Sequence, residues 1–228
     1  MYKYKKGDFH IHSTYSDGSL TPKELIEKAK KRKVDIISLT DHNSIKGIHE
    51  AIIEGEKRNI KVIPGVEVSS RFNNVRVHIL GYFKDGCFNE DFIEALDCIK
   101  NHNIKCFNKI IHNKLNISFR REHVCVEKII ALLKKFNATV ILAHPVLLPR
   151  KYFKDIVSIG FDGIEAKYYK NTKEDTDFFV NYAISNNMIY TAGSDFHNEI
   201  ELYRSHGNLG EVFLNESEID RFLKFLNK

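Results

Sequence analysis

Residues 8–18 read D-F-H-I-H-S-T-Y-S-D-G and place three candidate metal ligands near the start of the chain. His10 and His12 are two residues apart, so on a strand both imidazoles lie on one face while their apolar neighbours point to the other. Asp17 follows five residues after His12, in an Asp-Gly pair that is typical of a turn. The stretch therefore predicts a strand whose carboxyl end brings polar side chains together.

Short apolar runs recur along the chain and alternate with amphipathic segments. Six further runs predict buried strands, at 35–40, 61–66, 75–82, 139–143, 163–166 and 188–193. The other segments predict helices, at 21–32, 44–58, 90–114, 122–136, 150–158, 173–186 and 216–226. The first of these opens with T-P-K-E, a capping box with proline at the first helical position. Such alternation is typical of a mainly parallel sheet wound by helices, either an open doubly wound sheet or a closed barrel.

The composition is that of an ordinary globular protein, with 43% hydrophobic and 29% charged residues in 228. The net charge is +5, and the lysines are spread among glutamates rather than gathered in one run. This gives a mild bias toward anionic partners. Four cysteines without a CxxC spacing are expected to be reduced thiols rather than a zinc ribbon or a disulfide framework. No apolar run approaches the ~20 residues that span a bilayer, and no signal-peptide pattern follows the N-terminus, so we expect a cytoplasmic protein.

The domain organisation follows from the absence of repeats, low-complexity tracts and linkers. We expect residues 1–228 to form a single domain. Residues 84–137 break the alternation, because they are polar, rich in lysine and asparagine, and without a convincing strand. We interpret 84–137 as a small helical insertion within the domain.

Polar residues with ligand chemistry occur at or near the predicted strand ends. They are His10, His12, Asp17, His42, Glu67, His78, His144, Asp195 and His197, of which His78 lies within a strand pattern. Taken singly, each could be a hydrogen-bonded histidine, a helix cap or a turn residue. The carboxyl ends of parallel strands meet at one edge, where the active sites of such folds are built. The joint pattern therefore predicts a metal site there.

The number and type of these residues indicate more than one ion. Catalytic zinc usually takes three protein ligands and a water, so nine candidates imply two or three divalent ions. Nitrogen and oxygen donors without a thiolate suit zinc, manganese or iron, and the donor type does not choose among the three metals.

Six ordered motifs carry a resemblance to a known family. They are H-I-H-S-T-Y-S-D-G, S-L-T-D-H-N-S, I-P-G-V-E-V-S, V-H-I-L-G-Y, L-A-H-P and G-S-D-F-H. Over about residues 7–210 the chain resembles the polymerase and histidinol phosphatase (PHP) superfamily. It looks most like the stand-alone metal-dependent phosphoesterases, which include nucleoside 3′,5′-bisphosphate phosphatases and 5′-to-3′ exoribonucleases. The resemblance implies a distorted seven-stranded β/α barrel, TIM-like in form, with a metal cluster at its carboxyl edge, and so favours the closed barrel.

The resemblance also implies how the ligand positions are shared. One ion would be held by His10, His12, Glu67 and Asp195, a second by Glu67, His78 and His144, and a third by Asp17, His42 and His197. Glu67 would bridge two ions. A metal-bound water or a neighbouring histidine, His197 or His206, would protonate the leaving group, although His206 fits a surface loop equally well.

The implied activity is hydrolysis of a phosphate ester through a metal-bridged hydroxide. The expected substrate is a small phosphorylated metabolite, a nucleotide or a short oligonucleotide, with no membrane and no obligate protein partner. The alternatives are a histidinol-phosphatase-like phosphomonoesterase and a non-catalytic metal-binding module that binds a partner.

The residues that would contact the substrate are less clear than the metal ligands. Several relatives engage phosphate through arginines of a longer insertion, but residues 77–119 contain no arginine. Substitutes would be Lys105, Lys109, Arg120, Arg121, Arg150 or Lys167. Candidates for stacking on a base are Tyr15, Tyr82, Tyr168 and Tyr169.

Overall fold

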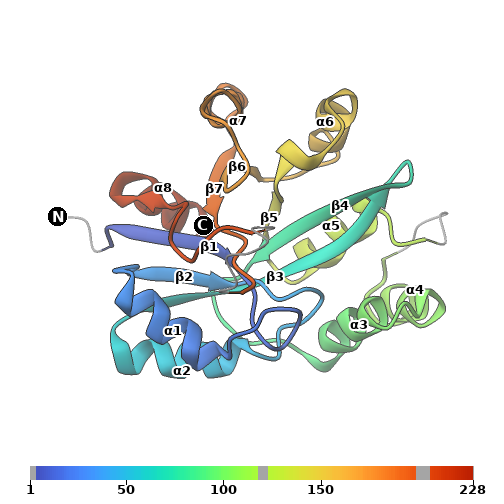
Figure 1. Ribbon diagram of the computed structural model, residues 1–228. Helices are drawn as coiled ribbons and strands as arrows, with labels where there is room; N and C mark the ends of the chain where they lie inside the picture. Colours follow the sequence, from blue (N-terminus) through green and yellow to red (C-terminus); the bar gives the residue numbers. More distant parts are fainter. Residues whose placement is uncertain (1–3, 118–122, 199–205, 228) are drawn as a thin grey trace.

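The computed structural model describes residues 4–117, 123–198 and 206–227 and arranges them around one sheet (Figure 1). The strands are β1 (Lys6–Ile11), β2 (Ile36–Leu39), β3 (Lys61–Phe72), β4 (Val75–Tyr82), β5 (Thr139–Leu142), β6 (Gly163–Tyr168), β7 (Ile189–Gly193) and β8 (Leu214–Asn215). Their order in the sheet is β7-β6-β5-β4-β3-β2-β1-β8. All seven strands expected from the sequence are present, and β8 adds two residues beside β1.

The sheet is mostly parallel and curls into a nearly closed barrel. Strands β1, β2 and β3 are parallel, as are β5, β6 and β7, whereas β4 runs antiparallel to both β3 and β5. The barrel closes where Ile11 at the end of β1 bridges Phe196 after β7, and the His12 N–H donates to the Phe196 carbonyl at 2.9 Å. The predicted barrel is confirmed, and the closure brings the carboxyl end of β1 beside that of β7.

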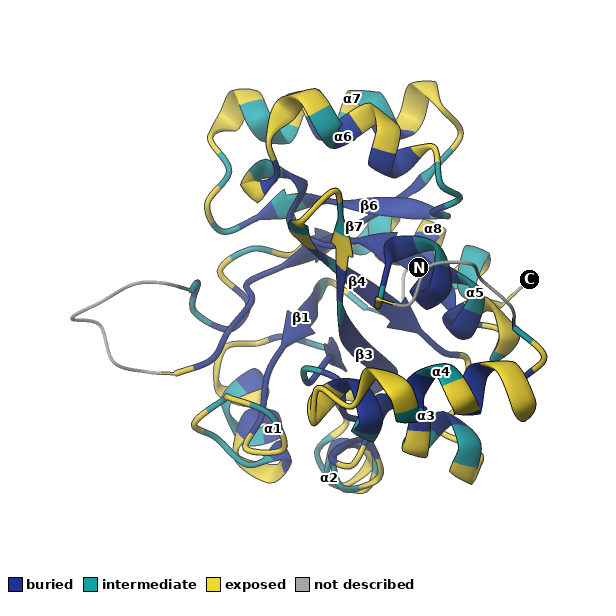
Figure 2. Cartoon of the chain, turned by 90° about the vertical axis from the view of Figure 1, so that its right-hand side faces the viewer, coloured by how far each residue is buried: buried dark blue, intermediate teal, exposed yellow. Residues whose placement is uncertain are grey.

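Helices cover the outside of the barrel. They are α1 (Pro22–Lys31), α2 (Ile48–Arg58), α3 (Glu90–Lys100), α4 (Ile104–Asn113), α5 (Val126–Lys135), α6 (Arg150–Val157), α7 (Lys173–Ser185) and α8 (Glu216–Leu226), with a short 3-10 turn at Pro145–Leu147. Helices α1 and α2 lie on the opposite side of the barrel from α6 and α7 (Figure 1). Their sheet-facing sides are buried and their outer sides exposed (Figure 2).

Capping decides where two of these helices begin and end. The Thr21 side chain accepts from the Glu24 N–H and completes the predicted capping box of α1. The helix expected over 90–114 is instead two helices. Residue His102 has a left-handed φ of 54°, and the Asn103 side chain caps the new helix α4. Asparagine at a cap competes with helix continuation, which the apolar periodicity alone does not reveal.

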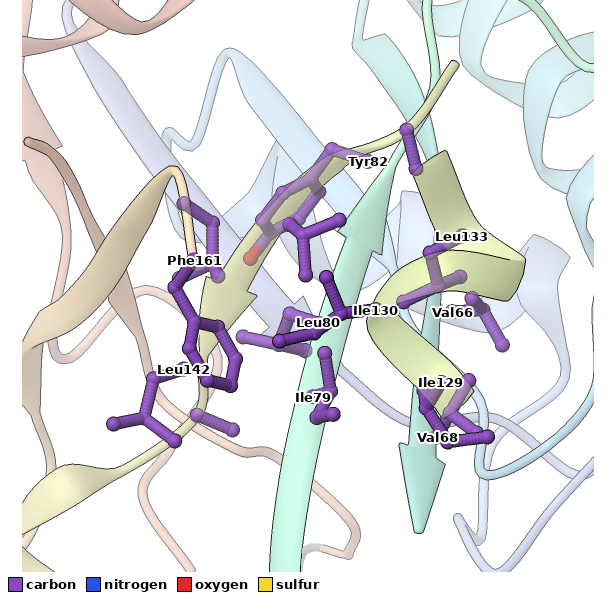
Figure 3. Packing of buried hydrophobic residues seen from close by; sticks show 14 of the residues in the cluster. Val66, Val68, Ile79, Leu80, Tyr82, Ile129, Ile130, Leu133, Leu142 and Phe161 are labelled. Carbon is purple, nitrogen blue, oxygen red and sulfur yellow. The ribbon is translucent and has the colours of Figure 1, made fainter. Parts of the chain in front are cut away.

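The helices of segment 84–137 differ in what they pack against. Helix α5 packs against β3 and β4, where Ile129 and Leu133 meet Val66 and Val68 (Figure 3). At Gly81 an added Cβ would lie 2.8 Å from Leu133 Cδ2, so glycine permits this close approach. Helices α3 and α4 pack chiefly on each other. Treating 84–137 as an insertion remains a prediction, and α5 within it forms part of the wall of the barrel.

The cysteines differ from expectation in one pair. Cys98 at the end of α3 and Cys106 in α4 form a disulfide, so the prediction of reduced thiols is wrong for these two. Their eight-residue separation matches no redox or metal motif, and they meet only because the chain turns back between α3 and α4. Cys87 and Cys125 are free.

Within the described segments, no helix combines the length and the apolar composition needed to cross a bilayer.

Candidate metal centre

Glu67 of β3 is the centre of a ring of histidines. Its carboxylate is 1% exposed. Imidazole nitrogens lie within 3.3 Å of its two oxygens, from His10, His12, His42, His78 and His144. These five histidines come from β1 or the residue after it, the loop after β2, β4, and the loop after β5. A single carboxylate therefore joins side chains delivered by four neighbouring strands.

Backbone hydrogen bonds fix the height of these side chains in the barrel. The Glu67 N–H donates to the Asp41 carbonyl at 3.3 Å, and the Asn43 N–H donates to the Glu67 carbonyl at 2.8 Å. Asp41 and Asn43 flank His42, so this pairing holds its imidazole beside Glu67. In the β3–β4 ladder, His78 pairs with Ser69, two residues beyond Glu67.

Two of the predicted ligands, each of which follows a strand, have unusual backbone angles themselves. His144 has φ of 28° and Asp195 has φ of 53°, values that side chains other than glycine seldom adopt. Such conformations persist where the surrounding structure fixes them, and they concentrate at functional sites. Here they turn both side chains from the strand ends toward the histidines.

The predicted ligands form overlapping groups whose donor atoms lie within 4.8 Å of one another. Three of the groups are His10, His12, Glu67 and Asp195; His12, Asp17, His42 and His197; and His42, Glu67 and His78. His144 joins through its Nε2, 3.1 Å from Glu67 Oε1. All nine predicted positions are thus close together. The expected division into three sets of ligands stays a prediction, since His12 also lies with Asp17, His42 and His197, and His42 rather than His144 is grouped with Glu67 and His78.

The donor atoms fit a group of divalent cations. Glu67 Oε2 and His42 Nδ1 are 2.9 Å apart and both buried, yet within the described part of the chain neither makes a hydrogen bond of acceptable geometry. Buried polar atoms normally have a partner. A cation between such atoms would satisfy them, and carboxylate and imidazole are common ligands of zinc, manganese and iron.

The charges of the cluster depend on one another. Burial alone would raise the pKa of Glu67, but the adjacent imidazoles of His10, His78 and His42 hold it well below the usual range. Burial disfavours protonation of His12, yet Asp195 and Glu67 raise its pKa to about 9. In the absence of metal, a proton on His12 thus compensates the carboxylates, and metal binding must displace it.

A second carboxylate, Glu165 of β6, supports the cluster from behind. It is fully buried, and its Oε1 lies 2.9 Å from His10 Nδ1. Its Oε2 accepts from the His144 backbone N–H at 2.7 Å. A carboxylate behind a histidine ligand fixes the orientation of the ring and raises its basicity. Glu165 is not among the residues predicted from the sequence, although an acid inside the apolar run G-I-E-A is itself a signal that a buried partner is required.

Two further residues surround Asp195. The Tyr168 hydroxyl donates to Asp195 Oδ2 at 2.9 Å, and His206 Nδ1 lies 3.2 Å from the same oxygen. The His206 ring also stacks on His197, with ring centroids 3.8 Å apart. His206 therefore belongs to the cluster rather than to a surface loop, and Tyr168 orients Asp195.

Three of the residues that were expected to contact the substrate are already engaged with other groups of the protein. Lys167 pairs with Glu218 and Arg150 with Asp175, while Tyr82 is fully buried with its hydroxyl on the Phe9 carbonyl. Tyr82 is therefore unavailable for stacking on a base. Arg120 and Arg121 lie outside the described residues.

A cavity of about 460 Å³ opens beside Asp17 and His42. Its lining includes five basic side chains that the sequence analysis passed over: Arg71, Arg76, Lys100, His102 and His123. The sequence signal for the arginines was present, because Arg71 continues the Glu67, Ser69 alternation. It was missed because the strand was expected to end at residue 66.

Comparisons with known proteins agree with the motifs. Over 77 residues the chain is 44% identical to a 5′-3′ exoribonuclease of Haemophilus influenzae, and the match spans 34% of this chain and 28% of that protein. Over 74 residues it is 43% identical to a 3′,5′-nucleoside bisphosphate phosphatase of Chromobacterium violaceum, spanning 32% and 26% of the two chains. The matched segments thus cover less than a third of either relative.

Solved structures agree with the fold over almost the whole chain. An amidohydrolase from Chromobacterium violaceum with bound sulfate superposes with a TM-score of 0.76 at 21% identity, covering 96% of both chains. A protein from Bifidobacterium adolescentis, described as a metal-dependent phosphoesterase, gives a TM-score of 0.72 at 19% identity, covering 98% of this chain and 97% of that one. The PHP domain family model matches residues 8–227. The resemblance is confirmed, and the chain belongs to the PHP domain family.

Proposed function

We propose that this protein is a metal-dependent phosphoesterase that hydrolyses a phosphate ester of a small metabolite or nucleotide. The observation that carries the proposal is the Glu67 carboxylate, buried among five imidazoles with Asp17 and Asp195 beside them. Uncharged tautomers of so many buried histidines can act as ligands, and the carboxylates supply the negative charge that cations need.

The cluster would hold two or three ions of manganese, zinc or iron. The expected sharing is His10, His12, Glu67 and Asp195 for one ion, Glu67, His78 and His144 for another, and Asp17, His42 and His197 for a third. Ions held by these residues would supply a nucleophile from water near neutral pH and would neutralise the charge of phosphate oxygens.

Individual side chains of the cluster would have separate roles in binding the ions and in protonating the leaving group. Glu67, kept ionised by its neighbours, would contribute a carboxylate to two of the proposed ion sites. His197 is buried, with Nε2 3.3 Å from the half-exposed Asp17 at Oδ1 and Nδ1 2.8 Å from the Asp195 carbonyl. A ring that binds the third ion cannot also protonate the departing oxygen, so His197 is a candidate for that role only if it does not hold the ion, and His206, stacked on it, is the second candidate.

The neighbouring relatives support phosphate as the reacting group, because those named above are a nuclease and a phosphatase. A relative from Eggerthella lenta, 42% identical over 76 residues, is a phosphoribosyl 1,2-cyclic phosphate 1,2-diphosphodiesterase. Since these relatives act on different phosphorylated substrates, they favour the reaction class more strongly than any one substrate.

The test combines metal analysis with turnover. Purified protein is reconstituted with manganese and assayed with a generic phosphomonoester, a phosphodiester, histidinol phosphate and a nucleoside bisphosphate. Hydrolysis that disappears in Glu67→Gln but persists in the surface variant Asp220→Asn supports the proposal. Histidinol phosphate as the single substrate would favour the phosphomonoesterase alternative, and bound metal without turnover of any ester would favour the non-catalytic one.

A further inference from the structure

A disulfide lies in the wall of the cavity beside the metal cluster. Cys98 and Cys106 are joined across the turn between α3 and α4. Cys98 lines the cavity of about 460 Å³ that opens beside Asp17 and His42. Four residues of the turn line the same cavity: Ile99, Lys100, His102 and Ile104. The disulfide therefore closes a turn that forms one wall of the space next to the cluster.

The end of α3 contacts two loops that carry predicted metal ligands. The Asp97 carboxylate lies 3.0 Å from Lys46 Nζ, on the loop after β2. Lys100 Nζ donates to the Tyr15 carbonyl at 2.7 Å, on the loop that carries Asp17. Both contacts are exposed to solvent, and exposed polar contacts of this kind contribute little by themselves. Their effect on the loops therefore depends on how firmly the end of α3 is held.

The disulfide restricts the turn between the two helices. Helices α3 and α4 lie together at one side of the barrel and pack chiefly on each other (Figure 1). The chain between them reverses at His102, where φ is 54°, and the Asn103 side chain caps α4. Closing such a turn with a covalent bond reduces the number of conformations that it can adopt. Lys100, within the turn, is therefore more confined when the disulfide is present.

The two cysteines differ in their accessibility to small molecules. Cys98 is 6% exposed, whereas Cys106 is half-buried. Cys106 also lines a second cavity, of about 320 Å³, between α3 and α4. A small thiol therefore reaches the disulfide more easily from the side of Cys106 than from the side of Cys98.

We propose that the Cys98–Cys106 disulfide is a redox-sensitive regulatory site, which is opened by thiols of low molecular weight and which, when closed, holds the Asp17 loop in position for metal binding. First, a thiolate attacks the Cys106 sulfur, a mixed disulfide forms there, and Cys98 leaves as a thiolate that takes up a proton. A second thiol then attacks the small-molecule sulfur of the mixed disulfide, so that Cys106 is released and the two small thiols become a disulfide. Two electrons thus pass from the small thiols to the protein, and the turn loses its covalent tie.

Opening of the disulfide and binding of metal should oppose each other. When the turn is released, Lys100 holds Tyr15 less firmly and Asp17 is less well positioned as a ligand. Coupling between two sites is reciprocal, so the disulfide must become harder to reduce, by the same factor, when metal is bound. A coupling of about 5-fold, at the low end for such pairs of sites, corresponds to about 21 mV for a two-electron couple. The inference rests on the proposed metal centre and adds a regulatory site to it.

The first measurement compares the reduction midpoint of the disulfide with and without manganese. The Cys87→Ser protein, which lacks the exposed free thiol, is equilibrated in glutathione redox buffers, because manganese binds thiols weakly. Alkylation and mass spectrometry then report the state of Cys98. The midpoint should be more negative by about 21 mV or more with manganese. Lys100→Met should remove this difference, whereas Lys105→Met, outside the cavity lining, should keep it.

Two further measurements need no thiol buffer during metal binding, or no metal. In competition with a chelator, the double variant Cys98→Ser/Cys106→Ser should bind its weakest manganese ion about 5-fold or more weakly than the unmodified chain. Cys87→Ser, the matched control, should bind it equally well. In the metal-free protein, amide hydrogen exchange at residues 13–19 should become faster on reduction. The midpoint measurement decides the matter if the double variant does not fold, since it keeps both cysteines.

The inference and the proposed function fail in different ways. Four alkylated cysteines before any reduction would overturn the regulatory site, because the unmodified chain should then show only Cys87 and Cys125. Equal midpoints with and without manganese, equal manganese affinities, or unchanged exchange at residues 13–19 would also overturn it. The phosphoesterase proposal fails separately, if the oxidised and metal-loaded protein hydrolyses none of the esters.

Discussion

Glu165 and His10 are joined by a buried contact of 2.9 Å between Oε1 and Nδ1, behind the face that His10 turns toward Glu67. The other oxygen of Glu165 receives the N–H of His144 from the neighbouring strand end. One carboxylate thus positions two of the proposed ligands, one from β1 and one from the loop after β5. Its role is to hold these two ligands in place, since it contacts His10 at the ring nitrogen away from Glu67 and His144 at the backbone N–H.

Replacing this carboxylate should weaken metal binding. We expect Glu165→Gln to lower the affinity for manganese or zinc about 10- to 100-fold, because the amide cannot match the charge behind the ring. Competition with a chromophoric chelator measures the affinity. The matched control is Glu218→Gln, which removes a carboxylate paired with Lys167 away from the histidines. Equal affinities in Glu165→Gln and the unmodified chain would contradict the positioning role.

The histidine cluster should make stability respond to pH in opposite ways with and without metal. The folded pKa of His12 is about 9, raised by Asp195 and Glu67 against the effect of burial. A raised pKa contributes stability that is complete below the unfolded value of about 6.5 and is lost as pH rises through the folded value. The melting temperature of the metal-free protein should therefore fall between pH 6.5 and 9.

With saturating metal the trend should reverse, because fewer protons compete for the imidazoles at higher pH. Scanning calorimetry at several pH values measures both trends. The surface variant His112→Gln should keep them, whereas His12→Gln should flatten the metal-free trend. A metal-free melting temperature that rises across this window would contradict the assigned charges.

The packing of α5 on the sheet should dominate the stability of segment 84–137. Leu133 is fully buried against β3 and β4, so Leu133→Ala should cost about 2–5 kcal/mol of unfolding free energy. Ile104 of α4 is 41% exposed, so Ile104→Ala should cost much less. Urea unfolding measures both. Similar costs for the two variants would indicate that α5 is no more a part of the barrel than α4.

The sequence predicted the strands, most helices and the nine cluster positions, because those features repeat local patterns. Strand direction was less accessible: the run at 75–82 has the same buried pattern as its parallel neighbours, yet β4 is antiparallel to β3 and β5. The turn at Asn73 and Asn74, both with left-handed φ, makes this hairpin possible.

Residues that act through a distant partner were not predicted. Glu165 meets His10 across 155 positions of the chain, and the Cys98–Cys106 pair depends on a turn inside a helical pattern. Arg71 and Arg76 line the cavity beside the cluster because the hairpin register places them on the face of Glu67 and His78. Such relationships belong to the three-dimensional arrangement rather than to local spacing.

The most direct test of the metal centre is the number of ions bound per chain after reconstitution and removal of excess metal, measured by inductively coupled plasma mass spectrometry. We predict two or three ions in the unmodified protein and at least one fewer in Glu67→Gln, since Glu67 is shared by the proposed sites. Asp220→Asn should leave the number unchanged. Fewer than two ions in the unmodified protein, or the same number in Glu67→Gln, would contradict the account.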